Sequence, residues 1–363
     1  MNQNKLKTLL EDTIQGHRLT VREAEDLFKS KGSDVWEIVS AADRLREEKV
    51  GDTVTYVRNQ NIHITNICKN LCGFCGFGKP KNSKDAFIFN TEDIIKGAML
   101  AKERDVTEVC LLSGVHPDFD VEKCADIIRT IHRVIPDVDI HAMSPDEIIH
   151  CADKSGISTE EVLEIFRDAG IGTLQGTAAE MLVDEVRKII CPLKLSTSQW
   201  VKIIKEAHNM GMKSTATIMY GTIEKGSDRA VHLGILRDIQ DETGGFTELV
   251  TLPFLYKNTK LYERGLTPAG ATGREDILMF AVSRLFLDNF DNVQVAWGKL
   301  GNKFTQLALM AGANDFGGTM FMDSVSVEAG GEDSDYLDPA EMKRIAEDAD
   351  RTLRQRDTKY NLI

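Results

Sequence analysis

Eight short β-rich runs alternate with amphipathic helical stretches after about residue 60. The runs are NIHIT at 61–65, TEVCLLSG at 107–114, DIHAMS at 139–144, IGTLQG at 171–176, KSTATIMYG at 213–221, FTELVTLPF at 246–254, NVQVAWGKLG at 292–301 and ANDFGGTM at 313–320. This alternation predicts an α/β fold with a parallel sheet, either closed into a (βα)8 TIM-type barrel or left open and doubly wound. The barrel is favoured because the number of predicted strands reaches eight with no break in composition between them. We therefore expect functional residues at the C-terminal ends of the strands.

The first part of the chain has no β-rich run. Three helices are predicted there, in LKTLLEDTI, in TVREAEDLFKS with Thr20 as the N-cap, and in SDVWEIVSAADRLREEK. We expect residues 1–55 to form an N-terminal helical extension, and residues 56–363 to form the barrel together with C-terminal helices.

The overall charge excludes some classes of function. The chain carries 44 basic and 57 acidic residues, a net charge of -13. This balance argues against a general binder of nucleic acid or of anionic membranes, which basic patches would favour. The chain has no 18-residue apolar run, and its start, MNQNKLKTLLEDT, lacks the apolar stretch of a signal peptide. A cytoplasmic location is expected.

Three of the seven cysteines fall close together in NIHITNICKNLCGFCGFGKP, directly after the first predicted strand. An ordinary iron–sulfur cluster or a structural zinc site takes four protein ligands. Cys68, Cys72 and Cys75 have no fourth cysteine nearby, so a [4Fe-4S] cluster held by them would keep one iron open. An open iron can bind the amine and carboxylate of S-adenosyl-L-methionine, and an electron from the cluster can then release a deoxyadenosyl radical. We expect Phe74 to pack on the adenine.

The cysteine triad also allows a different interpretation. The triad can be a zinc site whose fourth ligand is His63 or a carboxylate, in a non-catalytic barrel that binds a metabolite or partner.

The remaining four cysteines are scattered singly, which argues against a secreted disulfide framework and for a reducing compartment. These four are Cys110, Cys124, Cys151 and Cys191.

The cysteine motif resembles that of the radical S-adenosylmethionine superfamily. From about Leu19 onwards the chain resembles the branch that contains CofH, the tyrosine-adding subunit of the deazaflavin (FO) synthase, and the futalosine-pathway menaquinone enzymes. The matching segments are GDTVTYVRNQNIHITNIC, SGVHPD, HAMSPDEI, GTAAEMLVDEVRKIICP, TATIMYG, ETGGFTELVTLPF, AWGKLG and GANDFGGT.

The resemblance implies a specific reaction and its requirements. CofH-like enzymes transfer the 4-hydroxybenzyl group of L-tyrosine to 5-amino-6-(D-ribitylamino)uracil and release 2-iminoacetate. The implied cofactors are the [4Fe-4S] cluster and S-adenosyl-L-methionine. The implied partners are these small-molecule substrates, an electron donor and a CofG-like enzyme, with no nucleic acid and no membrane.

Four residues near predicted strand ends are candidates for binding S-adenosyl-L-methionine. The resemblance places Gly114 against the methionyl amino group, where a glycine permits close approach of the backbone. Ser144 is expected to bind the sugar or the amino acid, or else to cap a helix with Glu147. Glu180 suits the ribose hydroxyls and Arg187 the methionyl carboxylate, unless the two form a solvated surface pair.

A further set of residues is predicted to line the substrate pocket. Glu248 lies inside a β run and needs a polar partner, while Trp297 can equally fill the barrel. His63, His116 and His141 lie near the proposed mouth, but no general base is assigned. The other pocket candidates are Tyr220, Lys299, Asn314 and Asp315.

Five positions depart from the CofH pattern. They are Ser113, Gln175, Thr222, Tyr256 and Glu328, the last within SVSVEAGG. We expect Thr222, Tyr256 and Glu328 to face the substrate rather than the cluster, and so to alter its hydrogen-bond partners. The alternative function is therefore a CofH paralogue that uses the same radical on a different amino acid or acceptor, including futalosine-type menaquinone chemistry.

Overall fold

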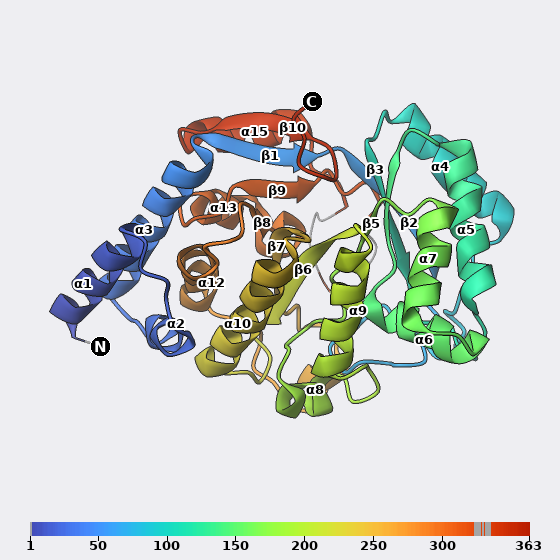
Figure 1. Ribbon diagram of the computed structural model, residues 1–363, viewed down its shortest axis with the longest axis horizontal. Helices are drawn as coiled ribbons and strands as arrows, with labels where there is room; N and C mark the ends of the chain where they lie inside the picture. Colours follow the sequence, from blue (N-terminus) through green and yellow to red (C-terminus); the bar gives the residue numbers. More distant parts are fainter. Residues whose placement is uncertain (1, 323–327, 329, 331–334) are drawn as a thin grey trace.

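The computed structural model describes residues 2–322, 328, 330 and 335–363, and within them ten parallel strands form one strongly curled sheet (Figure 1). All eight predicted strands are present. They are β2 (Asn59–Thr65), β3 (Glu108–Ser113), β4 (Asp139–Ala142), β5 (Thr173–Leu174), β6 (Lys213–Tyr220), β7 (Phe246–Pro253), β8 (Val293–Val295) and β9 (Asp315–Gly318).

These eight strands complete a barrel. Strands β2 to β9 neighbour one another in chain order, whereas a doubly wound sheet would reverse its order part of the way across. The circle is completed just beyond β9, where Gln60 of β2 pairs with Phe321 in a single parallel bridge. The Asn61 N–H donates to the Phe321 carbonyl at 2.9 Å across the same junction. The prediction of a TIM-type barrel is confirmed.

Two further strands, β1 (Thr53–Val57) and β10 (Thr352–Arg356), were not predicted. They pair with each other in parallel, and β1 also pairs with β9, so they extend the sheet beyond β9. The sequence TLRQR of β10 has little apolar character, and a strand at the edge of the sheet needs few apolar side chains. That weak signal explains why β10 was missed.

Helices cover the outside of the barrel (Figure 1). The N-terminal helices are α1 (Gln3–Ile14), α2 (Val21–Phe28) and α3 (Ser33–Val50); Thr20 caps α2, as predicted, and forms a capping box with Glu23. The others are α4 (Thr91–Glu103), α5 (Val121–Val134), α6 (Pro145–Ser155), α7 (Thr159–Ala169), α8 (Asp184–Ile190), α9 (Thr197–Asn209), α10 (Gly226–Thr243), α11 (Lys260–Glu263), α12 (Gly273–Phe286), α13 (Trp297–Leu309) and α15 (Pro339–Asp348). The α2 helix packs on α10, and α3 packs on α12.

One predicted element is shorter than expected. Strand β8 ends at Val295, and the rest of the run NVQVAWGKLG belongs to α13, which begins at Trp297. Trp297 and Lys299 therefore lie in the first turn of a helix rather than at a strand end. Throughout the described part of the chain, no helix is both long enough and apolar enough to cross a membrane.

Candidate active site

The three clustered cysteines lie in a loop that follows β2 at the C-terminal end of the barrel. The base of the loop is closed, because the Cys68 N–H donates to the Lys79 carbonyl at 3.0 Å and the Lys79 N–H donates to the Asn66 carbonyl at 2.7 Å. Inside it, the Gly78 N–H donates to the Cys75 Sγ at 3.3 Å. A methyl group at Gly78 would make ordinary van der Waals contacts with Cys68 Cβ at 3.4 Å and Cys75 Sγ at 3.7 Å, so Gly78 lies next to both cysteines.

The loop contains the donors that an iron–sulfur cluster takes. An iron–sulfur cluster is held by cysteine thiolates, each bound to a different iron, and Cys68, Cys72 and Cys75 are free thiols in this one loop. The Gly78 donor also fits, since hydrogen bonds to cysteine sulfur tune iron–sulfur clusters. Burial raises the pKa of the Cys72 and Cys75 thiols, so cluster binding would release their protons.

Gly114 lies where β3 ends against this loop. Its N–H donates to the Thr65 carbonyl at 2.8 Å. A methyl group there would lie 2.4 Å from the Ile67 carbonyl oxygen and 3.0 Å from Cys68 Cβ. The close approach that requires glycine is thus to the cysteine loop itself, and the predicted contact with the methionyl amine stays a prediction.

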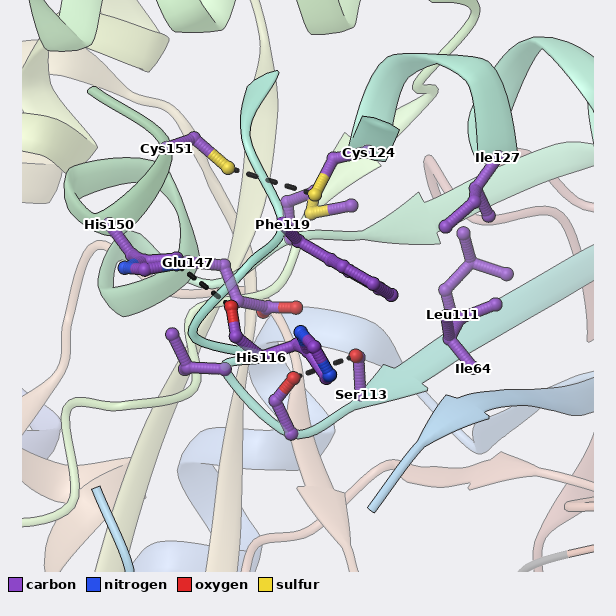
Figure 2. Close-up of a pocket in the computed structure, with 13 residues that line it drawn as sticks. Ile64, Leu111, Ser113, His116, Phe119, Cys124, Ile127, Glu147, His150 and Cys151 are labelled. Atoms are coloured by element: carbon purple, nitrogen blue, oxygen red, sulfur yellow. Dashed lines mark hydrogen bonds between the residues drawn. The ribbon is translucent and has the colours of Figure 1, made fainter. Parts of the chain in front are cut away.

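A small cavity of about 20 Å³ lies beside Gly114 (Figure 2). Ser113, one of the positions that depart from the CofH pattern, lines it and donates to the Gly114 carbonyl at 2.8 Å. Figure 2 also shows His116, whose ring stacks on Phe119 at 4.3 Å, and Glu147. The volume suits about one water molecule, which is too little for a substrate.

Ser144 caps helix α6. Its hydroxyl donates to Glu147 Oε2 at 2.7 Å, and the Glu147 N–H donates back to the Ser144 oxygen at 3.4 Å. The predicted alternative, a capping box before Pro145, is therefore confirmed. A contact between Ser144 and a cofactor sugar stays a prediction.

Glu180 and Phe74 are brought together by a residue that sequence reasoning missed. Lys194 donates to Glu180 Oε1 at 2.7 Å, with both side chains largely buried, and its Nζ lies 5.8 Å from the centre of the Phe74 ring. Burial lowers the pKa of Lys194, but the charges of Glu180 and its neighbours outweigh this and raise the pKa well above its ordinary value. Lys194 follows α8 in the segment CPLK, where no periodic pattern marks it.

Arg187 has a different environment from the one predicted. It is 3% exposed, and its guanidinium donates to the carbonyls of Ala178 at 3.1 Å and Leu195 at 2.7 Å, and also to that of Ala179. These bonds hold the turn in which Glu180 has a φ of 44°. Arg187 therefore positions Glu180, and neither residue belongs to a solvated surface pair. Its donors are engaged by carbonyls rather than directed at a methionyl carboxylate.

The inside of the barrel is a cavity of about 280 Å³ below the cysteine loop. Of the predicted pocket residues, Glu248, Trp297 and Lys299 line it, and so does Gln175, whose amide donates to the Leu111 carbonyl at 2.8 Å. Trp297 is 3% exposed and its indole N–H donates to the Gly318 carbonyl at 2.9 Å. Nine neutral polar residues also line it, namely Asn59, Asn61, Thr173, Thr177, Thr215, Thr217, Thr247, Gln294 and Thr358, together with apolar residues such as Leu112, Val250 and Phe316 and the charged side chains of Glu108 and Arg356.

The other predicted pocket residues form structural contacts. The Tyr220 hydroxyl donates to Asp276 at 2.9 Å, and the Asn314 side chain accepts from Arg284 at 2.6 Å. Asp315 forms a buried ion pair with Arg356, at 2.6 Å and 3.0 Å. None of Tyr220, Asn314 and Asp315 is among the described residues that line the cavity.

Three departures from the CofH pattern were expected to face the substrate, and the structure places them elsewhere. The Thr222 hydroxyl donates to Glu224 at 2.7 Å, within a buried network closed by Arg229. Tyr256 packs edge-on against Tyr262, with ring centres 4.5 Å apart. The Glu328 carboxylate lies 4.0 Å from Lys79 Nζ, so it is beside the cysteine loop that it was expected to face away from. The rest of SVSVEAGG, apart from Gly330, lies outside the described residues.

Glu248 has the most unusual electrostatic environment in the cavity. It is 5% exposed, and its Oε2 has no hydrogen-bond partner. Burial raises the pKa of Glu248 to about 8, against a partial lowering by the charge of Arg356. The carboxyl group is therefore protonated near neutral pH and can donate a hydrogen bond.

This protonation predicts a pH dependence of stability. Between its ordinary pKa of 4.5 and about 8, Glu248 keeps its proton only in the folded state. The unfolded state binds fewer protons there, so stability should fall as pH rises through this window. We expect Glu248→Gln to flatten the fall between pH 6.5 and 8, as measured by urea unfolding.

Asp276 provides the matched control for that measurement. Burial raises the pKa of Asp276 to about 6, so most of its titration is complete below the test range. Asp276→Asn should therefore leave the slope between pH 6.5 and 8 unchanged. An unaltered slope in Glu248→Gln would contradict the assignment.

The chain is similar to known proteins along nearly its whole length. Residues 62–234 match the family described as the radical SAM superfamily, and residues 243–363 match the CofH/MqnC C-terminal region. A protein of Methanoculleus marisnigri named 5-amino-6-(D-ribitylamino)uracil–L-tyrosine 4-hydroxyphenyl transferase is 57% identical, over 99% of this chain and 98% of the relative. A protein of the same name from Methanospirillum hungatei is 55% identical over the same shares. The crystal structure of methylornithine synthase (PylB) shares the fold, with a TM-score of 0.74, 18% identity, and coverage of 95% of this chain and 97% of that one.

Proposed function

Because the chain belongs to the radical SAM superfamily and, within it, to the family of 5-amino-6-(D-ribitylamino)uracil–L-tyrosine 4-hydroxyphenyl transferases, we propose that it catalyses this transfer. The 4-hydroxybenzyl group of L-tyrosine would pass to the ribityluracil, and 2-iminoacetate would be released. The observation that carries the proposal is a three-cysteine loop after β2 in a barrel whose cavity is lined by apolar and polar side chains, among them Asn59 and Asn61 of that same strand. A radical source held by the loop and a site for a small-molecule acceptor would thus share strand β2.

We assign the cluster ligands to Cys68, Cys72 and Cys75. They would hold a [4Fe-4S] cluster with one iron open to S-adenosyl-L-methionine. When bound, these two groups supply a deoxyadenosyl radical. The chain's own contribution is to bind and orient: Phe74 for the adenine, and Glu180, fixed by Lys194 and the Arg187 turn, for the ribose hydroxyls.

The departures from the CofH pattern give little support to a changed acceptor. Thr222, Tyr256 and Glu328 are outside the cavity lining, so their side chains do not alter the donors and acceptors inside it. Gln175 does line the cavity, but its amide N–H is already donated to the Leu111 carbonyl. A paralogue with another acceptor is therefore the second candidate.

The reaction needs partners beyond its substrates. We propose a one-electron donor that reduces the cluster, and a CofG-like enzyme that consumes the adduct. The fold also has the small-molecule cavity that this chemistry requires.

The transfer is tested by anaerobic incubation of reconstituted protein with dithionite, S-adenosyl-L-methionine, ribityluracil and tyrosine labelled with carbon-13 on its side chain. We expect deoxyadenosine and a labelled adduct, both followed by mass spectrometry. Deoxyadenosine without adduct would favour the paralogue. Protein that takes up no iron or sulfide would contradict the radical mechanism altogether.

A further inference from the structure

Three side chains in the barrel cavity have polar atoms without a hydrogen-bond partner. They are the Asn61 Nδ2 and Oδ1, the Glu248 Oε2 and the Thr358 Oγ1, on residues that are 1%, 5% and 5% exposed. The Thr358 Oγ1 lies near the Asp139 carboxyl group but outside hydrogen-bond geometry. An unpaired buried polar group costs about 1–3 kcal/mol, and the large majority of such groups in folded proteins are paired. Three in one cavity indicate that a polar ligand completes them.

Thr358 lies at one end of the barrel, and Asn61 and Glu248 lie within two of its strands. Thr358 is at the floor, since the next residue, Lys359, lies 3.9 Å from Asp139, the first residue of β4. Glu248 is the third residue of β7, and both Glu248 and Arg356 line the cavity. Asn61 is the third residue of β2, between the floor and the cysteines that follow the strand.

We propose that Asn61, Glu248 and Thr358 form the binding site for the acceptor, with Asn61 recognising the imide edge of its pyrimidinedione ring. The ribityl hydroxyls would then point towards the floor, to Glu248 and Thr358. This inference rests on the proposed function and assigns its acceptor site.

The chemistry of the three side chains matches that of the acceptor. A carboxamide presents one donor and one acceptor in a single plane, and the imide edge presents an N–H flanked by carbonyl oxygens, so two hydrogen bonds form together. A polyol offers hydroxyls that both donate and accept, as Thr358 does. The two charged side chains at the floor are already engaged, because Arg356 is paired with Asp315 and Glu108 accepts from Asn59 at 3.0 Å. A zwitterionic amino acid therefore finds no unpaired charge among them.

The test measures affinity for the acceptor separately from radical formation. In the reconstituted holoenzyme, Asn61→Leu should weaken ribityluracil binding roughly 100-fold, because two buried hydrogen bonds are lost, and Thr358→Val roughly tenfold. Binding is measured by anaerobic calorimetry. Deoxyadenosine formed from tyrosine without the acceptor should stay within about twofold of the wild-type amount, since the cluster loop is untouched.

Thr217→Val is the matched control. Thr217 lines the same cavity, but its hydroxyl already donates to the Gly176 carbonyl at 2.7 Å. The substitution should leave the affinity for ribityluracil unchanged. Equal weakening in Thr217→Val and Thr358→Val would overturn the assignment of Thr358.

An analogue series on the wild-type protein tests Asn61 without any substitution. N3-methylation of the ribityluracil removes the imide donor, and should cost the wild type at least tenfold in affinity and Asn61→Leu almost nothing. Wild-type protein that binds both compounds equally overturns the inference about Asn61. Wild-type protein that binds neither, yet still cleaves S-adenosyl-L-methionine, instead contradicts the proposed acceptor and hence the proposed function.

Discussion

Serine in place of Cys68, Cys72 or Cys75 is expected to reduce deoxyadenosine formation at least 1000-fold, to the level of protein without iron, since a cluster with only two thiolates is not retained. The local contacts of the loop agree with this expectation. Gly78 lies next to both Cys68 and Cys75, and its N–H donates to the Cys75 sulfur at 3.3 Å. Iron and sulfide content, expected at about four each per chain in the wild type, should fall in parallel with activity.

Cys110→Ser is the control for this prediction. Cys110 is in β3, lines the barrel cavity, and accepts from the Gln175 amide at 3.3 Å, away from the loop. It should retain iron, sulfide and deoxyadenosine formation. Retention of the cluster in any of the three loop variants would show that the ligand set is wrong.

Arg356→Met is expected to destabilise the protein by about 3–5 kcal/mol, as measured by denaturant unfolding. The partner carboxylate, Asp315, is completely buried, and Arg356 satisfies both of its oxygens. Removing the guanidinium leaves a buried negative charge whose remaining donors, within the described part of the chain, are the Thr55 hydroxyl and the Gly317 N–H. Because Arg356 ends β10 and Asp315 begins β9, the loss should also loosen the barrel floor.

Two comparisons separate this effect from a general one. Arg344→Met removes a pair with Glu341 in which the arginine is 68% exposed, and should cost less than about 1 kcal/mol. The double variant Arg356→Met with Asp315→Leu should recover much of the loss, since it removes the unpaired charge. A double variant no more stable than Arg356→Met would contradict the electrostatic explanation.

The cysteine loop and the Arg356–Asp315 pair have different roles in the proposed reaction. The loop would hold the cofactor, whereas the pair stabilises the barrel floor on which the acceptor is proposed to rest. Variants of the pair should therefore weaken ribityluracil binding through Thr358 while leaving tyrosine-dependent deoxyadenosine formation intact in the folded fraction.

Much of the fold could be predicted from the sequence because its signals are local. Eight strands were recognised by their β-rich runs, and the Thr20 and Ser144 capping boxes by residues three positions apart. The cysteine triad is equally local, since its three side chains fall within eight residues of chain and must share one loop. Spacing alone therefore constrained both the barrel and the cofactor chemistry.

Where each polar side chain finds its partner was decided only by the tertiary structure. Tyr220, Asn314 and Asp315 end or begin strands, as pocket residues do, but their partners come from α12 and β10 and engage them structurally. Lys194 follows α8 and donates to Glu180, which precedes that helix, and Arg187 donates to backbone carbonyls.

The proposed acceptor site illustrates this difference between local sequence signals and tertiary contacts. A parallel barrel with a three-cysteine loop after its first predicted strand could be read from the sequence, because periodicity and spacing are properties of neighbouring residues. The sequence did not reveal that Asn61, Glu248 and Thr358 share one cavity, since they are far apart in the chain and Thr358 follows a strand with little apolar signal. Only closure of the sheet brings them together. Side chains that point inward from distant strands share one cavity only when the strands form a closed barrel.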